Sequence, residues 1–204
     1  KLGFERPQQI KARKNTLTSA LVDLDVAFLD ATEALRAGRT DTHTFVPDDT
    51  HWSPAGSQKV AAAIAQNLSA ETYAGSSVTT RSLNSQPFDG DLLAFVNTGL
   101  FREAIGLAQH KLAQYETTVE STADLFGDTS LDVALVGTSF SAKPQWHFEG
   151  FLKQSLQADV LNLSLEGQGP FEPMKAFLAS DFLKSTPPKI VIWEIPVRYT
   201  SKEL

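Results

Sequence analysis

Residues 131–195 read LDVALVGTSFSAKPQWHFEGFLKQSLQADVLNLSLEGQGPFEPMKAFLASDFLKSTPPKIVIWEI, and the order of apolar runs in this stretch decides the fold class. Three of these runs predict strands, over residues 132–136, 159–163 and 189–195. Apolar residues at helical spacing predict two helices between them, over about residues 148–156 and 174–182. This alternation predicts an α/β fold with a parallel sheet, right-handed crossovers and helices on both faces of the sheet.

Candidate functional residues follow each of the three predicted strands. Ser139 stands in a Gly-Thr-Ser turn directly after the first strand. Gly167 and Gly169 lie in the turn after the second strand, and Arg198 and Tyr199 follow the third. Because open α/β sheets bind ligands at the carboxyl ends of their strands, we expect these residues to surround one site.

Outside this stretch, the clearest element is a helix that begins at Pro54 and ends at about Leu68. Ser53 is a typical N-cap, Pro54 suits the first helical position, and apolar residues recur every four positions. Nearer the N-terminus, the apolar run at residues 25–30 predicts a strand. Residues 31–37, followed by Gly38, predict a short helix.

The middle of the chain is less regular. Residues 69–98 are rich in Ser, Thr, Asn and Gly, which predicts a loop-rich excursion. An amphipathic helix is predicted next from apolar residues at helical spacing: Phe101, Ile105, Ala108, Leu112 and Tyr115. Residues 117–130 are polar and predict a loop.

The composition is that of a globular protein, with 42% hydrophobic and 21% charged residues, and residues 1–204 are interpreted as a single domain. No apolar run approaches the ~20 residues of a membrane-spanning helix. The absence of cysteine excludes disulfides, thiolate zinc sites and cysteine nucleophiles. A net charge of −6 argues against nucleic-acid binding. Because the chain starts with Lys1 rather than Met, we expect a longer protein and a missing N-terminal portion.

Asp49, His51 and Ser139 supply the residue types of a Ser-His-Asp triad. Asp49 and His51 lie two positions apart in one loop, so an extended segment points both side chains the same way. The carboxylate can then orient the imidazole while the imidazole takes the serine proton. This chemistry needs no cofactor.

Each of these residues also has a structural interpretation. A Gly-x-Ser turn after a strand is common, and an Asp-x-His pair in a loop is often solvated or caps a turn. A third alternative is a metal site formed by His43, Asp49 and His51. Several other residues are predicted to be structural, on helix surfaces, in a strand, or in the core or wall around a site: His110, His147, Asn162, Trp52 and Trp193.

Four segments resemble the AlgJ/AlgX family of alginate O-acetyltransferases, an SGNH-hydrolase-like group, and resemble its AlgJ branch most. They are residues 42–56 (THTFVPDDTHWSPAG), 134–142 (ALVGTSFSA), 147–171 (HFEGFLKQSLQADVLNLSLEGQGPF) and 187–199 (PPKIVIWEIPVRY). The resemblance implies an SGNH-like, flavodoxin-like fold. It also implies a circularly permuted site, because the Asp/His pair precedes the serine here and follows it in ordinary SGNH hydrolases.

The resemblance implies a role for each member of the triad. Asp49 is expected to be the orienting acid, His51 the general base and Ser139 the nucleophile. Ser141 is the rival nucleophile and ranks second, because the turn at Ser139 corresponds to the Gly-Asp-Ser block of SGNH enzymes.

The resemblance also implies an oxyanion hole, which acyl transfer requires. Its donors are expected to be the backbone N–H of Ser139 and a glycine of the second block, Gly169 or Gly167. Ordinary SGNH enzymes add an Asn from a third block, and residues 193–199 contain none. Tyr199 or Arg198 is therefore expected to supply the missing polar contact.

By the same resemblance, the chain is expected to be an O-acetyltransferase of exopolysaccharide biosynthesis that works through an acetyl-serine intermediate. The expected acceptor is a mannuronate hydroxyl of alginate or a relay protein, and the expected donor is a membrane-bound acetyltransferase. We expect a periplasmic location and an inner-membrane anchor before Lys1. Because a net charge of −6 gives no attraction toward a polyanion, the relay role is favoured.

Two alternatives remain open. One is an acetyltransferase or acetylesterase that acts on another polysaccharide, such as cellulose. The other is a non-catalytic scaffold of an acetylation complex. A scaffold should not react with a serine-directed reagent, so that reaction separates the two classes.

Overall fold

The structure is a computed structural model that describes residues 8–37, 43–69, 72–96, 101, 104–107, 109–120 and 131–201. At its centre, three parallel strands lie in the order β4 (Leu161–Asn162), β3 (Val133–Val136) and β5 (Ile190–Trp193). All four residues of β3 are buried, as expected for the middle strand of a sheet covered on both faces. The three strands predicted within residues 131–195 are therefore confirmed, with shorter bounds.

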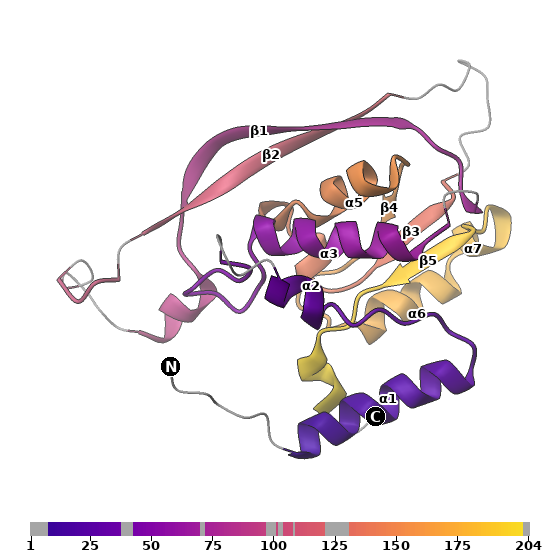
Figure 1. Cartoon of the computed structure of the whole chain (residues 1–204), viewed down its shortest axis with the longest axis horizontal. Helices are drawn as coiled ribbons and strands as arrows, with labels where there is room; N and C mark the ends of the chain where they lie inside the picture. The colour runs from indigo at the N-terminus through magenta and orange to yellow at the C-terminus, as the bar shows by residue number, and fades with distance from the viewer. Residues whose placement is uncertain are drawn as a thin grey trace.

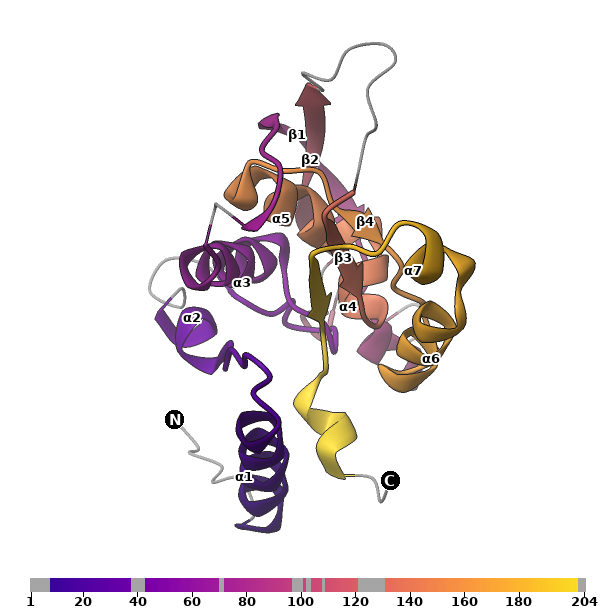
Figure 2. The same cartoon turned by 90° about the vertical axis from the view of Figure 1, so that its right-hand side faces the viewer.

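Helices cover both faces of this sheet (Figures 1 and 2). On one face, alternate side chains of β3 pack in the main core with α3 (Pro54–Asn67) and α5 (Phe148–Leu156). On the other face, the intervening side chains of β3 pack with α6 (Phe171–Ala179), and α7 (Asp181–Ser185) lies beside it. The predicted three-layer α/β arrangement is confirmed.

Helix boundaries follow the capping residues. Ser53 is extended and accepts a hydrogen bond from the N–H of Gly56, and Pro54 occupies the first turn of α3, as predicted. The single helix predicted over residues 174–182 is instead two helices. Ser180 ends α6 and caps α7 by accepting from the N–H of Leu183 at 3.3 Å.

The N-terminal predictions have different outcomes. The short helix is confirmed as α2 (Thr32–Ala37), and Gly38 lies outside the described residues. Residues 25–30 form no strand: Asp25 has φ 55°, and Val26 and Phe28 are exposed. This prediction is wrong because an apolar run becomes a strand only where a neighbouring strand takes its backbone hydrogen bonds, and no described strand pairs with these residues.

Before that segment, α1 (Gln8–Asp23) lies against the 3₁₀ helix η5 (Val197–Ser201), so the two ends of the described chain meet (Figure 1). No helix within the described ranges is long and apolar enough to cross a membrane.

The middle of the chain forms a long antiparallel hairpin. β1 (Ser77–Phe88) pairs with β2 (His110–Glu120), and the pair packs against α5 as it arches over the helices (Figure 1). The loop-rich excursion predicted over residues 69–98 is therefore wrong where β1 lies. The 3₁₀ helix η2 (Asp91–Phe95) follows β1.

The helix predicted from Phe101 to Tyr115 is also wrong, because its second half is β2. Leu112 and Tyr115 fit helical spacing, yet they reach the core from β2, whose pairing with β1 shifts register between Leu83 and Gln86 of β1. A spacing of three between two apolar residues therefore did not distinguish a helix from an irregular strand. Residues 117–120 belong to β2 rather than to the predicted loop, while Ala108 and residues 121–130 lie outside the described residues.

Candidate active site

β3 ends in a turn that presents Ser139 as the first residue of the short helix α4 (Ser139–Ala142). Thr138 caps this helix, and its hydroxyl accepts a hydrogen bond from the N–H of Phe140 at 3.3 Å. The N–H of a first helical residue has no partner within its helix. Nothing else in the described chain accepts the N–H of Ser139, so a free backbone donor stands beside its hydroxyl.

The loop that carries Asp49 and His51 is closed at its base by an antiparallel bridge between Phe45 and Trp52. Across this base, the N–H of Val46 donates to the carbonyl of His51 at 3.2 Å. The first turn of α3 follows directly, so the loop is held between a bridge and a capped helix.

This loop and the β3 turn meet to form an unbroken hydrogen-bonded chain. Asp49 Oδ1 lies 2.6 Å from His51 Nδ1, and His51 Nε2 lies 2.7 Å from Ser139 Oγ. All three residues are buried. With the proton on Nδ1, the imidazole donates to Asp49 and accepts from the Ser139 hydroxyl, which is the tautomer that a general base needs.

Aromatic side chains enclose the imidazole. The ring of His51 stacks on Trp146 with centroids 5.2 Å apart, and the tilted ring of Phe140 has its centroid 4.7 Å from that of the imidazole. Trp52 packs edge-on against Phe140 and donates from Nε1 to the carbonyl of Phe140 at 3.0 Å, so it is a wall residue, as predicted. These contacts fix the ring and limit water around it.

Trp193 is the second predicted wall residue. It is partly exposed, and its Nε1 donates to the carbonyl of Pro170 at 2.9 Å beside the ring of Phe171. It therefore supports the turn after β4 and does not contact the triad directly.

The metal site predicted as an alternative does not form from His43, Asp49 and His51. Within the described ranges, the one group of three possible ligands is Asp49, His51 and Asp91, whose ligand atoms lie within 4.8 Å of one another. Both ring nitrogens of His51 are already engaged, one by Asp49 and the other by Ser139. The arrangement fits acyl transfer better than metal binding.

Glu194, directly after β5, contacts the nucleophile turn and was not singled out from the sequence. Its Oε2 accepts from the N–H of Thr138 at 2.8 Å, from the Thr138 hydroxyl at 2.9 Å and from the Ser141 hydroxyl at 3.2 Å. The Ser141 hydroxyl is thus directed to Glu194, while the Ser139 hydroxyl is directed to His51. The sequence signal that could have identified Glu194 is its position at the carboxyl end of a parallel strand.

The environment of Glu194 is electrostatically mixed. Burial raises the pKa of its carboxyl, while the hydrogen bonds from Thr138 and Ser141 and the positive charge of Arg198 oppose that rise. Gly137 makes this approach possible, because a Cβ there would lie 2.7 Å from Glu194 Oε2. A glycine at the end of β3 therefore lets two neighbouring strand ends meet.

The remaining residues predicted for the site lie in the turn after β4 and in η5. Gly167 and Gly169 both have positive φ, at 78° and 67°. The Tyr199 ring lies against Gly169, where an added Cβ would be 3.1 Å from Cε1. Arg198 places its guanidinium 5.2 Å from the centre of the Phe140 ring, beside the triad. The structure thus brings Gly169, Tyr199 and Arg198 together, whereas Gly167 has open space beside its Cα.

Two histidines differ from their predicted positions on helix surfaces. His110 is the first residue of β2, and its Nε2 lies 3.4 Å from Asp48 Oδ1. His147 precedes α5 with φ 51°, and its Nε2 lies 2.7 Å from Thr117 Oγ1 on the hairpin. Burial lowers the pKa of His147. Both predictions are wrong because the hairpin, to which His110 belongs and which His147 contacts, was itself not predicted.

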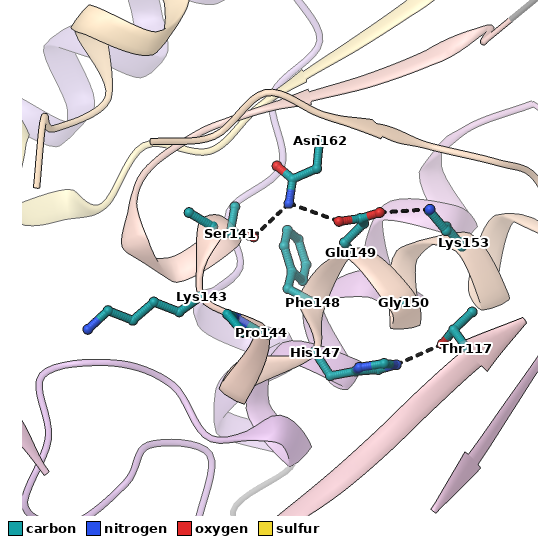
Figure 3. A pocket seen from close by; sticks show the side chains of 11 residues that line it. Thr117, Ser141, Lys143, Pro144, His147, Phe148, Glu149, Gly150, Lys153 and Asn162 are labelled. Carbon is teal, nitrogen blue, oxygen red and sulfur yellow. Dashed lines mark hydrogen bonds and ion pairs between the residues drawn. The ribbon is translucent and has the colours of Figure 1, made fainter. Parts of the chain in front are cut away.

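A pocket opens behind the nucleophile turn, between α4, α5 and β2 (Figure 3). Asn162 donates there to the carbonyl of Ser141 at 2.9 Å and to Glu149 Oε2 at 3.1 Å, as a structural residue would. Lys153 is paired with Glu149 at 2.7 Å. These polar side chains satisfy one another, so the pocket supports the turn and adds no reactive group.

The comparisons with known proteins agree on one family. The model of the SGNH hydrolase-like domain of acetyltransferase AlgX matches residues 3–197. The probable alginate O-acetylase AlgJ of Azotobacter vinelandii is 37% identical over 187 residues, which are 88% of this chain and 48% of the relative. The AlgJ of Pseudomonas aeruginosa is also 37% identical over 187 residues, 83% of this chain and 47% of the relative. The chain spans about half the length of these curated relatives.

Solved structures show the same fold. The O-acetyltransferase domain of Pseudomonas putida AlgJ matches with a TM-score of 0.84 and 31% identity, over 99% of this chain and 70% of that one. Pseudomonas aeruginosa AlgX matches with a TM-score of 0.69 and 25% identity, over 90% of this chain and 45% of that one. These matches confirm the SGNH-like fold expected from the sequence.

Proposed function

Because the chain belongs to the family of SGNH hydrolase-like acetyltransferase domains of the AlgX type, we propose that it is an O-acetyltransferase of alginate biosynthesis. The observation that carries this proposal is the continuous chain of hydrogen bonds from Asp49 through His51 to Ser139, at 2.6 and 2.7 Å. It ends on a serine that also offers a free backbone N–H. These are the nucleophile, base, acid and oxyanion donor that acyl transfer needs.

In the first half-reaction, Ser139 is acetylated. Ser139 Oγ attacks the acetyl carbonyl of the donor while His51 Nε2 takes the hydroxyl proton, and Asp49 stabilises the resulting imidazolium. The N–H of Ser139 donates to the oxyanion, with Gly169 or Gly167 as the second backbone donor and Tyr199 or Arg198 as a further polar contact. The bond between acetyl and the donor breaks, and the leaving group takes the proton from His51.

In the second half-reaction, the acetyl group passes from Ser139 to the acceptor. His51 removes the proton from an acceptor hydroxyl, and the oxygen of that hydroxyl attacks the carbonyl of acetyl-Ser139. The bond to Ser139 Oγ breaks, Ser139 recovers the proton from His51, and the acceptor leaves as its acetyl ester. The acceptor is a mannuronate hydroxyl of alginate or a relay protein, the donor is a membrane-bound acetyltransferase, and the location is periplasmic.

Enclosure of the triad favours transfer over hydrolysis. Ser139 is only 9% exposed and His51 only 4% exposed, and two aromatic rings contact the imidazole. Limited water access protects an acetyl-serine intermediate until an acceptor arrives. The assembled triad also disfavours a scaffold without catalytic function.

The proposal is tested by turnover of a chromogenic acetyl ester. Ser139→Ala, His51→Ala and Asp49→Ala should each lose ~10²-fold or more in kcat/KM, because they remove the nucleophile, the general base and the carboxylate that orients and stabilises that base. Matching circular dichroism spectra serve as the control for folding. Rapid-quench mass spectrometry should find an acetyl group on Ser139 in the parent protein alone. An inert parent protein with no acetyl-Ser139 would contradict the proposal.

A further inference from the structure

In the described part of the segment between β1 and β2, Asp91, the first residue of η2, makes side-chain hydrogen bonds to the catalytic loop. Its carboxylate accepts from the N–H of Thr50 at 2.8 Å through Oδ1 and from the Thr50 hydroxyl at 2.5 Å through Oδ2. Its own N–H donates to Asp49 Oδ2 at 2.9 Å. Asp91 therefore holds the loop at two consecutive residues.

These contacts complete the hydrogen bonding of the catalytic acid. Asp49 Oδ1 accepts from the N–H and from Nδ1 of His51, at 2.8 and 2.6 Å. Its other oxygen, Oδ2, accepts from Asp91. With both oxygens bound from opposite sides, the carboxylate plane has one orientation, and that orientation sets the imidazole.

Thr50 lies between the acid and the base in the chain, so its anchoring fixes the backbone that joins them. The next residue of η2 adds a further contact, because the N–H of Leu92 donates to the carbonyl of Asp48 at 3.1 Å. Gly90 allows this approach, since a Cβ there would lie 2.0 Å from the same carbonyl oxygen. The two segments are packed backbone to backbone.

Asp91 also carries a charge near the base. Its Oδ2 lies 3.6 Å from His51 Nδ1, but its side chain is 38% exposed, so solvent screens that charge. Its geometric contribution to the loop therefore outweighs its electrostatic one.

We propose that Asp91 is a positioning residue for the Asp49–His51 pair, which it holds in the geometry for proton transfer by clamping Thr50 and Asp49 from the β1–β2 insertion. This inference rests on the proposed function, because it assigns Asp91 to the same triad. It implies that the hairpin insertion is part of the catalytic unit.

The experiment compares Asp91→Ala with Asp91→Asn by ester turnover. The Asn side chain can accept from the Thr50 N–H and donate to the Thr50 hydroxyl, so Asp91→Asn should stay within ~3-fold of the parent kcat if geometry outweighs charge. Asp91→Ala releases Thr50 and should lose ~10- to 10²-fold in kcat with little change in KM, because a misplaced base slows chemistry more than binding. Phe95→Ala, at an 86% exposed position on the same 3₁₀ helix, is the matched control with unchanged rates.

A second readout separates this inference from the proposed function. The low-field proton resonance of His51 Nδ1–H, identified by its absence in His51→Ala, should be sharp in the parent and in Asp91→Asn. In Asp91→Ala it should broaden or vanish. A parent that shows the resonance without turnover would overturn the proposed function and leave the positioning inference standing. Asp91→Ala with parental kcat and an unchanged resonance would overturn the inference.

Thr50→Val provides the test if Asp91→Ala does not fold. It removes the hydroxyl contact to Asp91, together with a long 3.4 Å contact of the same hydroxyl to His51 Nδ1, and keeps the backbone contact to Asp91. It should therefore lose ~3- to 10-fold in kcat, between the parent and a full release. An unchanged kcat and resonance in Thr50→Val would also overturn the inference.

Discussion

Ser139 and Ser141 stand two residues apart on α4 and have opposite surroundings. The Ser139 hydroxyl is 2.7 Å from the general base, while the Ser141 hydroxyl donates to Glu194 at 3.2 Å. In a helix, residues two positions apart point to different sides, so a single base cannot serve both. The geometry therefore favours Ser139 over its rival as the nucleophile.

Ser141→Ala should keep ester turnover within ~5-fold of the parent, because Glu194 retains both hydrogen bonds from Thr138. The expected cost is the ~1 kcal/mol of a single hydrogen bond, seen as a small change in stability. Active-site labelling with a serine-directed reagent provides the measurement. The modified peptide should carry the label on Ser139 in both proteins, and a label on Ser141 would reverse the assignment.

At the scale of elements, α3 connects the site to the main core. Its N-terminal turn packs on the loop that carries the triad residues, and Gly56 is the point of closest approach, where an added Cβ would be 2.0 Å from the carbonyl oxygen of Thr44. A glycine here lowers the helix propensity by about 1 kcal/mol relative to alanine. The close packing explains why glycine is nevertheless used.

Gly56→Ala should lower the melting temperature despite the higher helix propensity of alanine. Forcing the loop away from α3 costs about 1–3 kcal/mol, which exceeds the ~1 kcal/mol gained in the helix. Thermal unfolding followed by circular dichroism measures the balance. Gly75→Ala is the matched control, since a Cβ there would meet only Gln157 O at an ordinary 3.7 Å. A melting temperature that rises in Gly56→Ala would contradict the predicted collision.

At the scale of the whole molecule, α1 brings the two ends of the described chain together. It lies against η5, and Lys14 forms an ion pair with Asp30, just before α2. Burial by itself would raise the pKa of Asp30, but hydrogen bonds from Lys14 and Thr32 lower it to about 2. The ionised form of Asp30 therefore stabilises the folded chain.

The contribution of Asp30 should depend on pH in a defined window. Its pKa is lower in the folded state than the ordinary value of 3.8, so its stabilisation is present above pH ~4 and is lost as the pH falls toward 2. The difference in melting temperature between the parent and Asp30→Asn should become smaller as the pH falls from about 4 to about 2. Glu33→Gln, which changes an exposed carboxylate on α2, is the control. A difference that stays constant from pH 5 to pH 2 would contradict the assignment.

Sequence patterns predicted the three parallel strands, the positions of helices between them and the start of α3, and they singled out Asp49, His51 and Ser139 as candidate site residues. Each depends on local signals: apolar periodicity, a capping serine, a proline in the first turn, and polar residues at the ends of strands. These signals involve only a few neighbouring residues, so they can be recognised without knowing which segments pack against them.

The hairpin, the positions of His110 and His147, and the contacts of Asp91 and Glu194 with the site depend instead on long-range packing. The hydrogen bond from Asp91 to Asp49 spans 42 residues of chain, and that from Thr138 to Glu194 spans 56. Strand pairing and buried hydrogen bonds form between segments that are distant in sequence, and their stability depends on the partner that packing provides. Local pattern carries no information on that partner, which is why the contacts of Asp91 and Glu194 with the candidate site were found only in the folded chain.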